Sequence, residues 1–153
     1  MTFKVGFIGM SHLGINCLAA TSEKNFSVIG FDFDKRKIEK LNSYRFDIFE
    51  PKLNSILKKN KKRIYFTDQI DKLKNCKLIY YVYDTETSDK NKPNYSNQKS
   101  RINKILSKLT KKNIFIIKSQ VFPGFSETFN NGKNKIYYEV ETLIFGQAIK
   151  QAI

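Results

Sequence analysis

The sequence has few of the residues that build several common kinds of site. Its two cysteines, Cys17 and Cys76, show neither the spacing of a disulfide framework nor that of a metal site. No stretch approaches the roughly 20 apolar residues that a membrane-spanning helix needs. The N-terminus lacks the basic region and apolar run of a secretory signal peptide. We therefore expect a reduced, cytoplasmic protein that binds no metal ion and no membrane.

Acidic residues are also scarce, with 14 Asp and Glu against 28 Lys and Arg, a formal net charge of +14. Such a charge attracts nucleic acid or anionic membranes. Only four of the basic residues are arginine, and the lysines are spread along the chain among Asn and Ile, as in residues 58–62. Basic and aromatic residues do not alternate as they do in single-strand binders. We therefore interpret most lysines as solvated, expect no specific nucleic-acid partner, and expect the positive field to favour an anionic cofactor.

The length of 153 residues and the hydrophobic content of 41% predict one domain, residues 1–153, with its own core. Short apolar runs alternate with helical patterns at the spacing of β–α–β units. The predicted strands are residues 4–9, 27–33, 64–66, 78–83, 113–117 and 136–138. The predicted helices are residues 15–20, 35–41, 70–73 and about 100–109, together with a stretch that begins at residues 50–51 and has proline in its first turn. A polar loop at residues 88–98 precedes the last helix. The expected fold is α/β, a Rossmann-type doubly wound, mainly parallel sheet with helices on both faces.

The turn after the first predicted strand resembles the G-x-G-x-x-G turn of dinucleotide-binding folds, with Gly9 and Gly14 in the outer places and Ser11 in the middle one. The first glycine permits a tight turn, and the third lets the helix pack on the strand. The helix N-terminus then faces the phosphates. The Ser11 hydroxyl has two open roles, a hydrogen bond to a phosphate oxygen and a cap on the helix. We expect His12, the only histidine, to be a loop residue near the cofactor rather than a catalytic base.

Asp32 ends the second predicted strand, 18 residues after Gly14. An acid in this place binds the ribose hydroxyls of a dinucleotide. Its carboxylate repels a 2′-phosphate, which favours NAD over NADP. The basic residues 35–37 have two open roles, accommodating such a phosphate or forming a solvated helix face.

Five groups of residues resemble, in order, the N-terminal NAD-binding domain of the UDP-glucose/GDP-mannose dehydrogenases. They are Val5–Gly14 with Val28–Asp32, residues 49–53 (F-E-P-K-L), residues 81–87 (Y-V-Y-D-T-E-T), residues 119–124 (S-Q-V-F-P-G) and residues 139–148 (E-V-E-T-L-I-F-G-Q-A). The resemblance implies NAD as the cofactor. It also implies oxidation of the C6 alcohol of a nucleotide sugar to a carboxylate, through a thioester on a catalytic cysteine, as in polysaccharide biosynthesis.

The same resemblance implies a cofactor site and one acid/base residue. The implied positions are Gly9, Ser11, His12, Leu13 and Gly14 at the pyrophosphate, Asp32 and Lys37 at the adenosine ribose, Thr85 and Thr87 along the nicotinamide half, Ser119 and Gln120 at the next strand tip, and Glu141 in catalysis.

Some residues depart from the family pattern. Gln120 stands where most members have threonine, Glu86 where many have proline, and Phe145 where a second acid is often found. The family's catalytic cysteine comes from a central helix and second domain that follow this region, and neither Cys17 nor Cys76 matches its position. We therefore expect the 153 residues, as a truncated gene product or fragment, to be incomplete for catalysis alone. A complementing chain and a homo-oligomer are the two partners left open.

Three alternatives stay open. The first is a non-catalytic Rossmann module that binds a nucleotide or a partner, the second is a basic nucleic-acid-binding protein, and the third is a different NAD-linked hydroxyacid dehydrogenase. Residues 50–51 and 141–148 disfavour the third. We also expect Leu143, Ile144 and Phe145 to be exposed on a face that the second domain covers.

Overall fold

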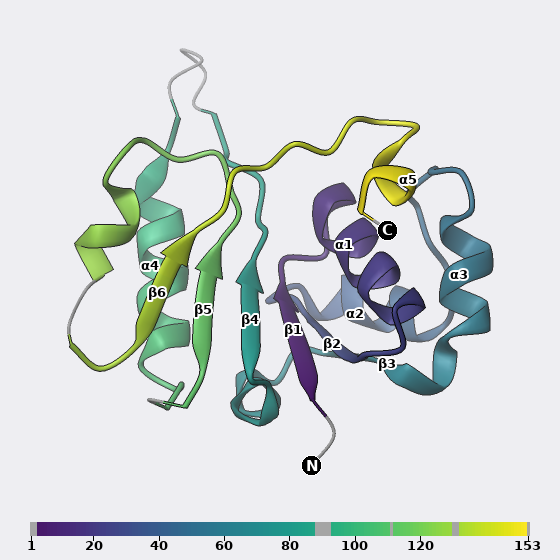
Figure 1. Cartoon of the computed structure of the whole chain (residues 1–153), viewed down its shortest axis with the longest axis horizontal. Coiled ribbons are helices and arrows are strands. Elements are labelled where there is room, and N and C mark those ends of the chain that lie inside the picture. The colour runs from purple at the N-terminus through teal and green to yellow at the C-terminus, as the bar shows by residue number, and fades with distance from the viewer. Residues whose placement is uncertain (1–2, 88–92, 111, 130–131, 153) are drawn as a thin grey trace.

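The computed structural model describes residues 3–87, 93–110, 112–129 and 132–152. Six strands form one sheet in the order β3-β2-β1-β4-β5-β6, and every neighbouring pair is parallel (Figure 1). The strands are β1 (Lys4–Ile8), β2 (Ser27–Phe31), β3 (Ile64–Thr67), β4 (Leu78–Tyr81), β5 (Ile114–Ile117) and β6 (Lys135–Tyr138). This order is the doubly wound Rossmann arrangement, so the predicted fold class is confirmed.

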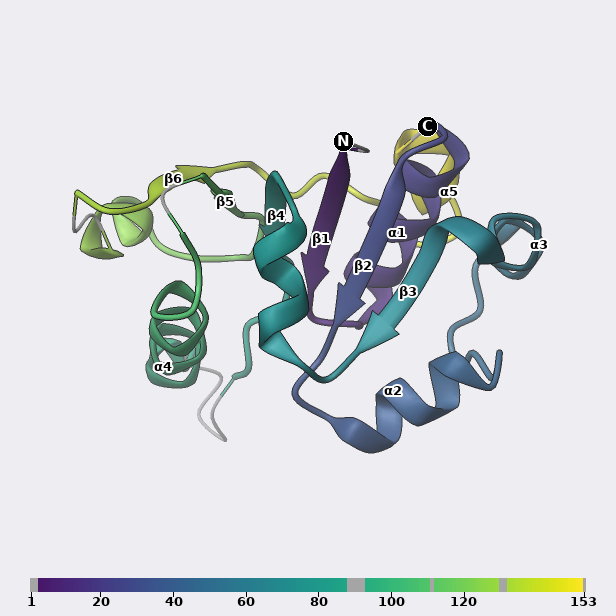
Figure 2. The same ribbon diagram turned by 90° about the horizontal axis from the view of Figure 1, so that it is seen from below.

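Helices cover both faces of the sheet, with α1 and α5 on one side and α4 on the other (Figures 1 and 2). The α-helices are α1 (His12–Glu23), α2 (Lys35–Asn42), α3 (Leu53–Lys59), α4 (Tyr95–Leu106) and α5 (Ala148–Ala152). Short 3₁₀ helices lie at Lys61–Arg63, Ile70–Asn75 and Phe125–Phe129. In the part of the chain that the structure describes, none of the helices has the length and apolar character needed to cross a bilayer.

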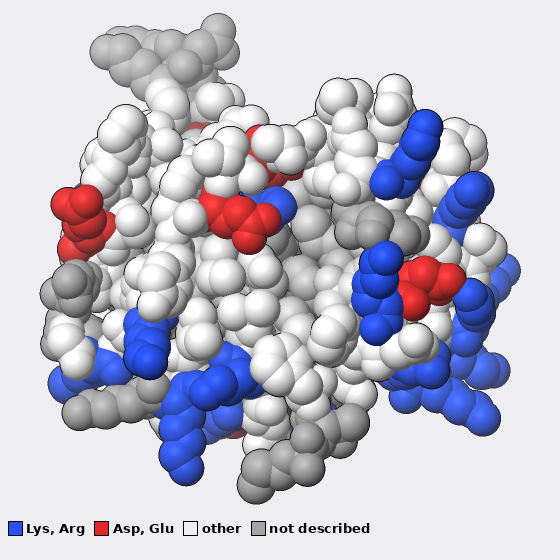
Figure 3. Space-filling model, in the orientation of Figure 1, with Lys and Arg blue, Asp and Glu red and all other residues white. Residues whose placement is uncertain are grey.

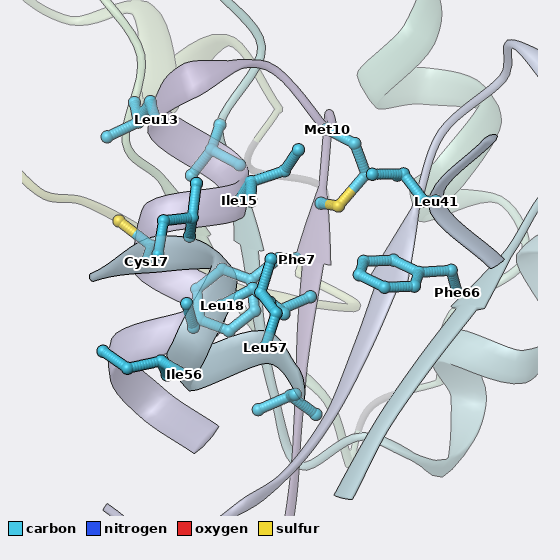
Figure 4. Close-up of a cluster of buried hydrophobic side chains, with 14 of the residues drawn as sticks. Phe7, Met10, Leu13, Ile15, Cys17, Leu18, Leu41, Ile56, Leu57 and Phe66 are labelled. Carbon is cyan, nitrogen blue, oxygen red and sulfur yellow. The ribbon is translucent and has the colours of Figure 1, made fainter. Parts of the chain in front are cut away.

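Two hydrophobic clusters, one on each face, hold the layers together. The first joins Phe7 of β1 to Leu18 of α1 and Leu57 of α3 (Figure 4). The second joins Tyr81 of β4 to Ile102 of α4 and neighbouring side chains. Each such side chain stabilises the fold by about 1.5–3 kcal/mol when it is fully buried. The sheet is therefore packed on both faces, as its nearly continuous apolar strands predict.

Several predicted elements have different boundaries. α1 spans His12–Glu23 rather than residues 15–20, and β2 ends at Phe31 rather than residue 33. Three further differences concern β4, α4 and α3. β4 ends at Tyr81, not residue 83, so that Tyr83 projects from the loop beyond the strand. α4 begins at Tyr95 rather than near residue 100, because Asn94 caps it by accepting a hydrogen bond from the Ser96 N–H at 3.1 Å. α3 begins at Leu53, after a residue with a left-handed φ of 67°, so the proline lies outside its first turn. Residues 88–92 of the predicted polar loop lie outside the described residues.

The order of the strands also locates the site. The crossovers run in opposite directions from β1 and β4, and open α/β sheets bind ligands at the carboxyl ends of the strands at such a switch point. The segment after β6 crosses these carboxyl ends and places α5 beside α1 (Figure 1). Loops from β1, β2, β4, β5 and β6 therefore converge at one edge of the sheet.

Candidate dinucleotide site

The turn between β1 and α1 has the backbone that a phosphate-binding turn requires. Gly9 has a φ of +105°, which favours glycine. A Cβ atom on Gly14 would lie 1.8 Å from the Gly9 carbonyl oxygen, so only glycine permits this approach of helix to strand. α1 begins at His12, and the first N–H groups of a helix have no partner within it. The turn thus presents N–H groups and the positive end of the helix dipole to an anion.

Ser11 occupies the N-cap position of α1, but its side chain makes no capping hydrogen bond. Its hydroxyl instead lies 3.5 Å from the carbonyl oxygen of Val82, to which it donates. The prediction that the Ser11 side chain caps the helix is therefore wrong, because its hydroxyl points toward the loop after β4. Its role toward a phosphate stays a prediction.

The Asp32 carboxylate, at the end of β2, is buried and fully hydrogen-bonded. Oδ2 accepts from the Met10 N–H at 2.8 Å and from Lys37 Nζ at 3.2 Å. Oδ1 accepts from the Asp34 N–H at 3.0 Å and from the Tyr83 hydroxyl at 2.7 Å. Burial opposes ionisation of Asp32, but these donors outweigh it and hold the carboxyl pKa below its ordinary value. Asp32 is therefore an anion at neutral pH.

The basic residues after Asp32 have separate surroundings. Lys37 pairs with Asp32, as the family resemblance implies for the ribose side. Lys35 lies 4.0 Å from Glu39 on the exposed face of α2, where an ion pair contributes little. Arg36 is also exposed. The sequence left two interpretations open for these residues, a solvated helix face and a site for a 2′-phosphate. Lys35 and Arg36 form a solvated face, and Lys37 pairs with the Asp32 carboxylate.

His12 is the first residue of α1 and not a loop residue, so the expectation for its position is wrong. Its Nε2 lies 2.9 Å from Oε2 of Glu50, whose side chain is only 1% exposed. The Phe145 ring covers the imidazole, with the ring centroids 4.1 Å apart. Glu50, a residue 38 positions away, orients the histidine, which is why no local pattern revealed this contact.

Glu50 joins three parts of the chain. Besides His12, its carboxylate accepts hydrogen bonds from the N–H groups of Gly146 and Ala148, each at 3.0 Å. Burial disfavours the charge, but His12 and the two N–H groups outweigh it and lower the Glu50 pKa. Glu50 thus ties the segment after β6 to the N-terminus of α1. The sequence segment F-E-P-K-L indicated Glu50 as part of the family pattern. It did not indicate that Glu50 contacts His12, Gly146 and Ala148.

A cavity of about 290 Å³ lies beside His12 and Leu13, and it gathers most of the residues predicted along the nicotinamide half. Its lining comprises His12, Leu13, Tyr83, Asp84, Thr85, Ser119, Gln120, Glu141, Leu143 and Phe145. Thr87 does not line it. That residue is exposed and forms an isolated antiparallel bridge with Pro93, since the loop has already turned away from the sheet.

A second cavity, of about 520 Å³, lies at Asp32. It is lined by Ser11, Asp32, Phe33, Asp34, Lys37, Tyr83, Asp84, Glu86 and Arg101. Tyr83 and Asp84 line both cavities, so the two lie on either side of the loop after β4. Glu86 and Arg101 form an ion pair at 2.9 Å at this cavity. Tyr83 and Arg101 are site residues that the sequence did not indicate.

The polar side chains of the first cavity are connected to the backbone around them. The Thr85 hydroxyl donates to the Gln120 carbonyl oxygen and accepts from Gln98 Nε2 at 2.6 Å. The buried Ser119 hydroxyl donates to the Tyr81 carbonyl oxygen at 3.3 Å. Glu141 accepts from the N–H of Leu143. The bonds of Thr85 and Ser119 join the loops after β4 and β5, whereas the bond between Glu141 and Leu143 lies within the loop after β6.

The apolar residues after Glu141 differ in exposure. Ile144 is 55% and Phe145 77% exposed, in agreement with the expectation for this segment. Leu143 is partly buried against the first hydrophobic cluster, so the expectation is wrong for this residue. The bonds from Gly146 and Ala148 to Glu50 hold the segment against α1.

Neither cysteine has the surroundings of a nucleophile. Cys17 and Cys76 are free and buried, and burial raises their pKa values to about 11 and about 12. Thiols act as nucleophiles in the thiolate form, so both remain unreactive at neutral pH. Both cysteines are packed in the two hydrophobic clusters, in agreement with the expectation that neither is the catalytic cysteine.

The lysines lie mainly on the outer surface. Lys58, Lys59, Lys61 and Lys62 are exposed, while Asn60 between them is buried. On the face in Figure 3, basic side chains gather along the lower margin and on the right, where an acidic group lies among them, while other acidic groups lie at the left edge and in the upper centre. The two cavities at the carboxyl ends of the strands include one lysine, Lys37, and one arginine, Arg101, in their linings.

These features define a class of protein, a Rossmann-type dinucleotide-binding domain. The glycine turn, the buried Asp32 and the two adjoining cavities suit the pyrophosphate, the adenosine and the nicotinamide ends of such a cofactor.

Comparisons with known proteins give the family. Residues 3–143 match the model of the UDP-glucose/GDP-mannose dehydrogenase family, NAD binding domain. The UDP-N-acetyl-D-mannosamine dehydrogenase of Pyrococcus horikoshii is 23% identical over 126 residues, which are 81% of this chain and 30% of that protein. Its solved structure has a TM-score of 0.87 at 20% identity, covering 97% of this chain and 38% of that one. The GDP-mannose dehydrogenase of Pseudomonas aeruginosa, solved as a ternary complex, has a TM-score of 0.83 at 21% identity, covering 96% and 38%.

The chain therefore belongs to the UDP-glucose/GDP-mannose dehydrogenase family and comprises its NAD-binding domain. The predicted family, fold and cofactor are confirmed. The chain spans about a third of the length of these relatives.

Proposed function

We propose that this chain is the cofactor-binding part of a nucleotide-sugar 6-dehydrogenase, which oxidises a sugar CH–OH with NAD⁺ as acceptor. The observation that supports this most is the pair of cavities on either side of Tyr83 and Asp84, one at Asp32 and one at Glu141. A dinucleotide needs two such sites joined across a helix N-terminus. When bound, NAD⁺ supplies the hydride acceptor.

In this proposal the residues of the chain divide the work of binding. Gly9 shapes the turn, and the N–H groups of residues 11–14 hold the pyrophosphate. Asp32 and Lys37 bind the adenosine ribose, and the loops at Thr85 and Ser119–Gln120 bind the nicotinamide side. Glu141 lies in the same cavity as these loops and serves as the acid/base residue. Leu13 and the ring of Phe145 limit the access of water on the α1 side.

The same proposal includes a second domain, a cellular location and a biological process. A second domain, from the remainder of a longer polypeptide or from a separate chain, supplies the catalytic cysteine and binds the nucleotide sugar. The reaction takes place in the cytoplasm and serves polysaccharide biosynthesis. Exposed Ile144 and Phe145 support the presence of such a domain next to Glu141.

Calorimetric titration with NAD⁺ tests the binding step. We expect one site per chain, and the absence of heat up to millimolar NAD⁺ would overturn the proposal. Replacement of the exposed Asp47 by Asn provides a control, since its carboxylate pairs only with Lys40 on the surface among the described contacts. Its affinity should equal that of the unmodified chain.

One observation favours a second function, a nucleotide-binding module without turnover. The Asp32 carboxylate has all its acceptor positions occupied by groups of the protein itself. Incubation with NAD⁺ and UDP-glucose or GDP-mannose can exclude this second function but not the first, because the chain alone is expected to be incomplete for catalysis. NADH formation by this chain alone excludes the module without turnover.

A further inference from the structure

The four hydrogen bonds to Asp32 raise a question about how a ribose reaches it. A carboxylate has about four lone-pair positions, two on each oxygen. Met10, Asp34, Lys37 and Tyr83 donate to all four at distances of 2.7–3.2 Å. A ribose hydroxyl can therefore donate to Asp32 only after one of these donors has left.

The four donors differ in how easily they move. Met10 and Asp34 donate backbone N–H groups, fixed by the turn after β1 and by the start of α2. Lys37 is a flexible side chain, 39% exposed, and its bond of 3.2 Å is the longest of the four. The Tyr83 hydroxyl makes the shortest, at 2.7 Å, and also accepts a hydrogen bond from the Phe33 N–H at 3.1 Å. Tyr83 is thus the most firmly attached of the side-chain donors.

The ring of Tyr83 also occupies space at the turn itself. A Cβ atom on Gly9 would lie 2.9 Å from Tyr83 Cγ and 3.0 Å from its Cδ2, so the ring lies directly against the first glycine. Tyr83 lines both cavities and separates one from the other. A dinucleotide that spans the two cavities must pass this ring.

Neighbouring side chains hold the ring in place. Phe33 stacks on it with an interplanar angle of 18° and centroids 6.4 Å apart. The Arg101 guanidinium carbon lies 4.7 Å from the ring centroid, within the range of a cation–π contact, and Arg101 is fixed by Glu86. The Tyr83 side chain therefore extends from the loop after β4 into a position that Phe33 and Arg101 fix. Its contact with Asp32 is part of this packing.

We propose that Tyr83 is an internal competitor for the ribose position on Asp32. Its ring lies against Gly9 and lines both cavities, so the Tyr83 hydroxyl, rather than the more weakly bound Lys37 ammonium, leaves the carboxylate when the nucleotide binds. This inference rests on the proposed function. Tyr83 then keeps the affinity for NAD⁺ low, since each binding event exchanges one phenol hydrogen bond to a carboxylate for one from a ribose hydroxyl. It also confers specificity, because a nucleotide without a ribose diol cannot replace the lost bond.

The test compares Tyr83→Phe with a matched variant, Tyr80→Phe. Both remove one phenol hydroxyl near the end of β4, but Tyr80 stacks on Phe7 in the other layer, with the centroids 5.3 Å apart. NAD⁺ and ADP-ribose are titrated into each protein by calorimetry. We expect Tyr83→Phe to bind both ligands about tenfold more tightly than the unmodified chain, the scale of one hydrogen bond to a charged group. Tyr80→Phe should leave both affinities unchanged.

Unchanged or weaker binding by Tyr83→Phe, with a normal far-UV circular dichroism spectrum, would overturn the inference while leaving the proposed function intact. A lack of binding by all three proteins would overturn both. A second measurement uses the unmodified chain alone. The amide resonance of Phe33, which donates to the Tyr83 oxygen, should move on addition of ADP-ribose toward its position in Tyr83→Phe. A resonance that stays in place at saturation would show that the hydroxyl has not left.

Discussion

Glu50 accepts a hydrogen bond from the backbone N–H of Gly146, which follows it by 96 residues, at 3.0 Å. The same carboxylate contacts His12 at the first turn of α1. One buried acid thus connects the glycine turn to the segment that contains Glu141. The position of the candidate acid/base residue relative to the helix N-terminus depends on this contact.

Replacement of Glu50 by Gln should lower the free energy of unfolding by about 1–3 kcal/mol, because an amide has one acceptor oxygen for three donors. Urea denaturation measures this change. Glu39→Gln is the control, since that side chain is 63% exposed and its pair with Lys35 is 4.0 Å long. The control should change the free energy by less than about 0.5 kcal/mol. Equal stability of Glu50→Gln and the unmodified chain would show that the contact does not hold the segment.

Acid should destabilise the fold through Asp32 and Glu50. Both have pKa values below the ordinary ones of about 3.9 and 4.3, so the unfolded chain binds more protons in this range. Their contribution is present above the unfolded-state values and is lost as the pH falls through the folded-state values. Urea denaturation between about pH 6 and pH 3 should show stability falling below about pH 5, with a smaller fall in Glu50→Gln. A stability that rises over this range would contradict the prediction.

Gly14→Ala should be far more harmful than Gly6→Ala. The new Cβ atom would lie 1.8 Å from a backbone oxygen at Gly14, but 3.1 Å from the Leu73 Cδ2 atom at Gly6, where a side chain can move. We expect a loss of about 3 kcal/mol or more for Gly14→Ala, since α1 must shift from the strand, and less for Gly6→Ala. Thermal and urea denaturation of the two variants provide the comparison. Similar losses would mean that the close approach of α1 to β1 is not required.

NAD⁺ should bind more tightly than NADP⁺, by about tenfold or more, because a 2′-phosphate would meet the Asp32 anion at short range. Lys37 does not offset this, since it already pairs with Asp32. Calorimetry with the two cofactors measures the ratio, and Asp32→Asn should reduce it. Preferential binding of NADP⁺ by the unmodified chain would contradict the assignment of Asp32.

Much of the fold could be predicted because its signals are local. The apolar runs that form β1 and β2, and the turn from Gly9 to Gly14, lie in consecutive residues. Each strand was found from its own composition, and the parallel order follows from the alternation of strands and helices. The start of α4 was missed because the polar residues after Asn94 have no apolar stripe that distinguishes them from a loop.

The site was predicted less completely because its decisive contacts join distant residues. Asp32 was identified from its distance to the glycine turn, but Tyr83, which donates to it, lies 51 positions away on another strand tip. Glu50 and His12 likewise meet only in the folded chain. Thr87 was assigned from the resemblance, and the loop after β4 turns away from the cavity before reaching it.

The most direct test of the central claim is to map NAD⁺ binding onto the chain by NMR of the ¹⁵N-labelled protein. The account predicts that amide resonances of residues 9–14, 32–34 and 83–85 move with one common affinity, while those at the opposite ends of the strands, such as Lys4 and Lys77, stay in place. Shifts confined to the opposite ends of the strands, or no shifts at millimolar NAD⁺, would contradict it.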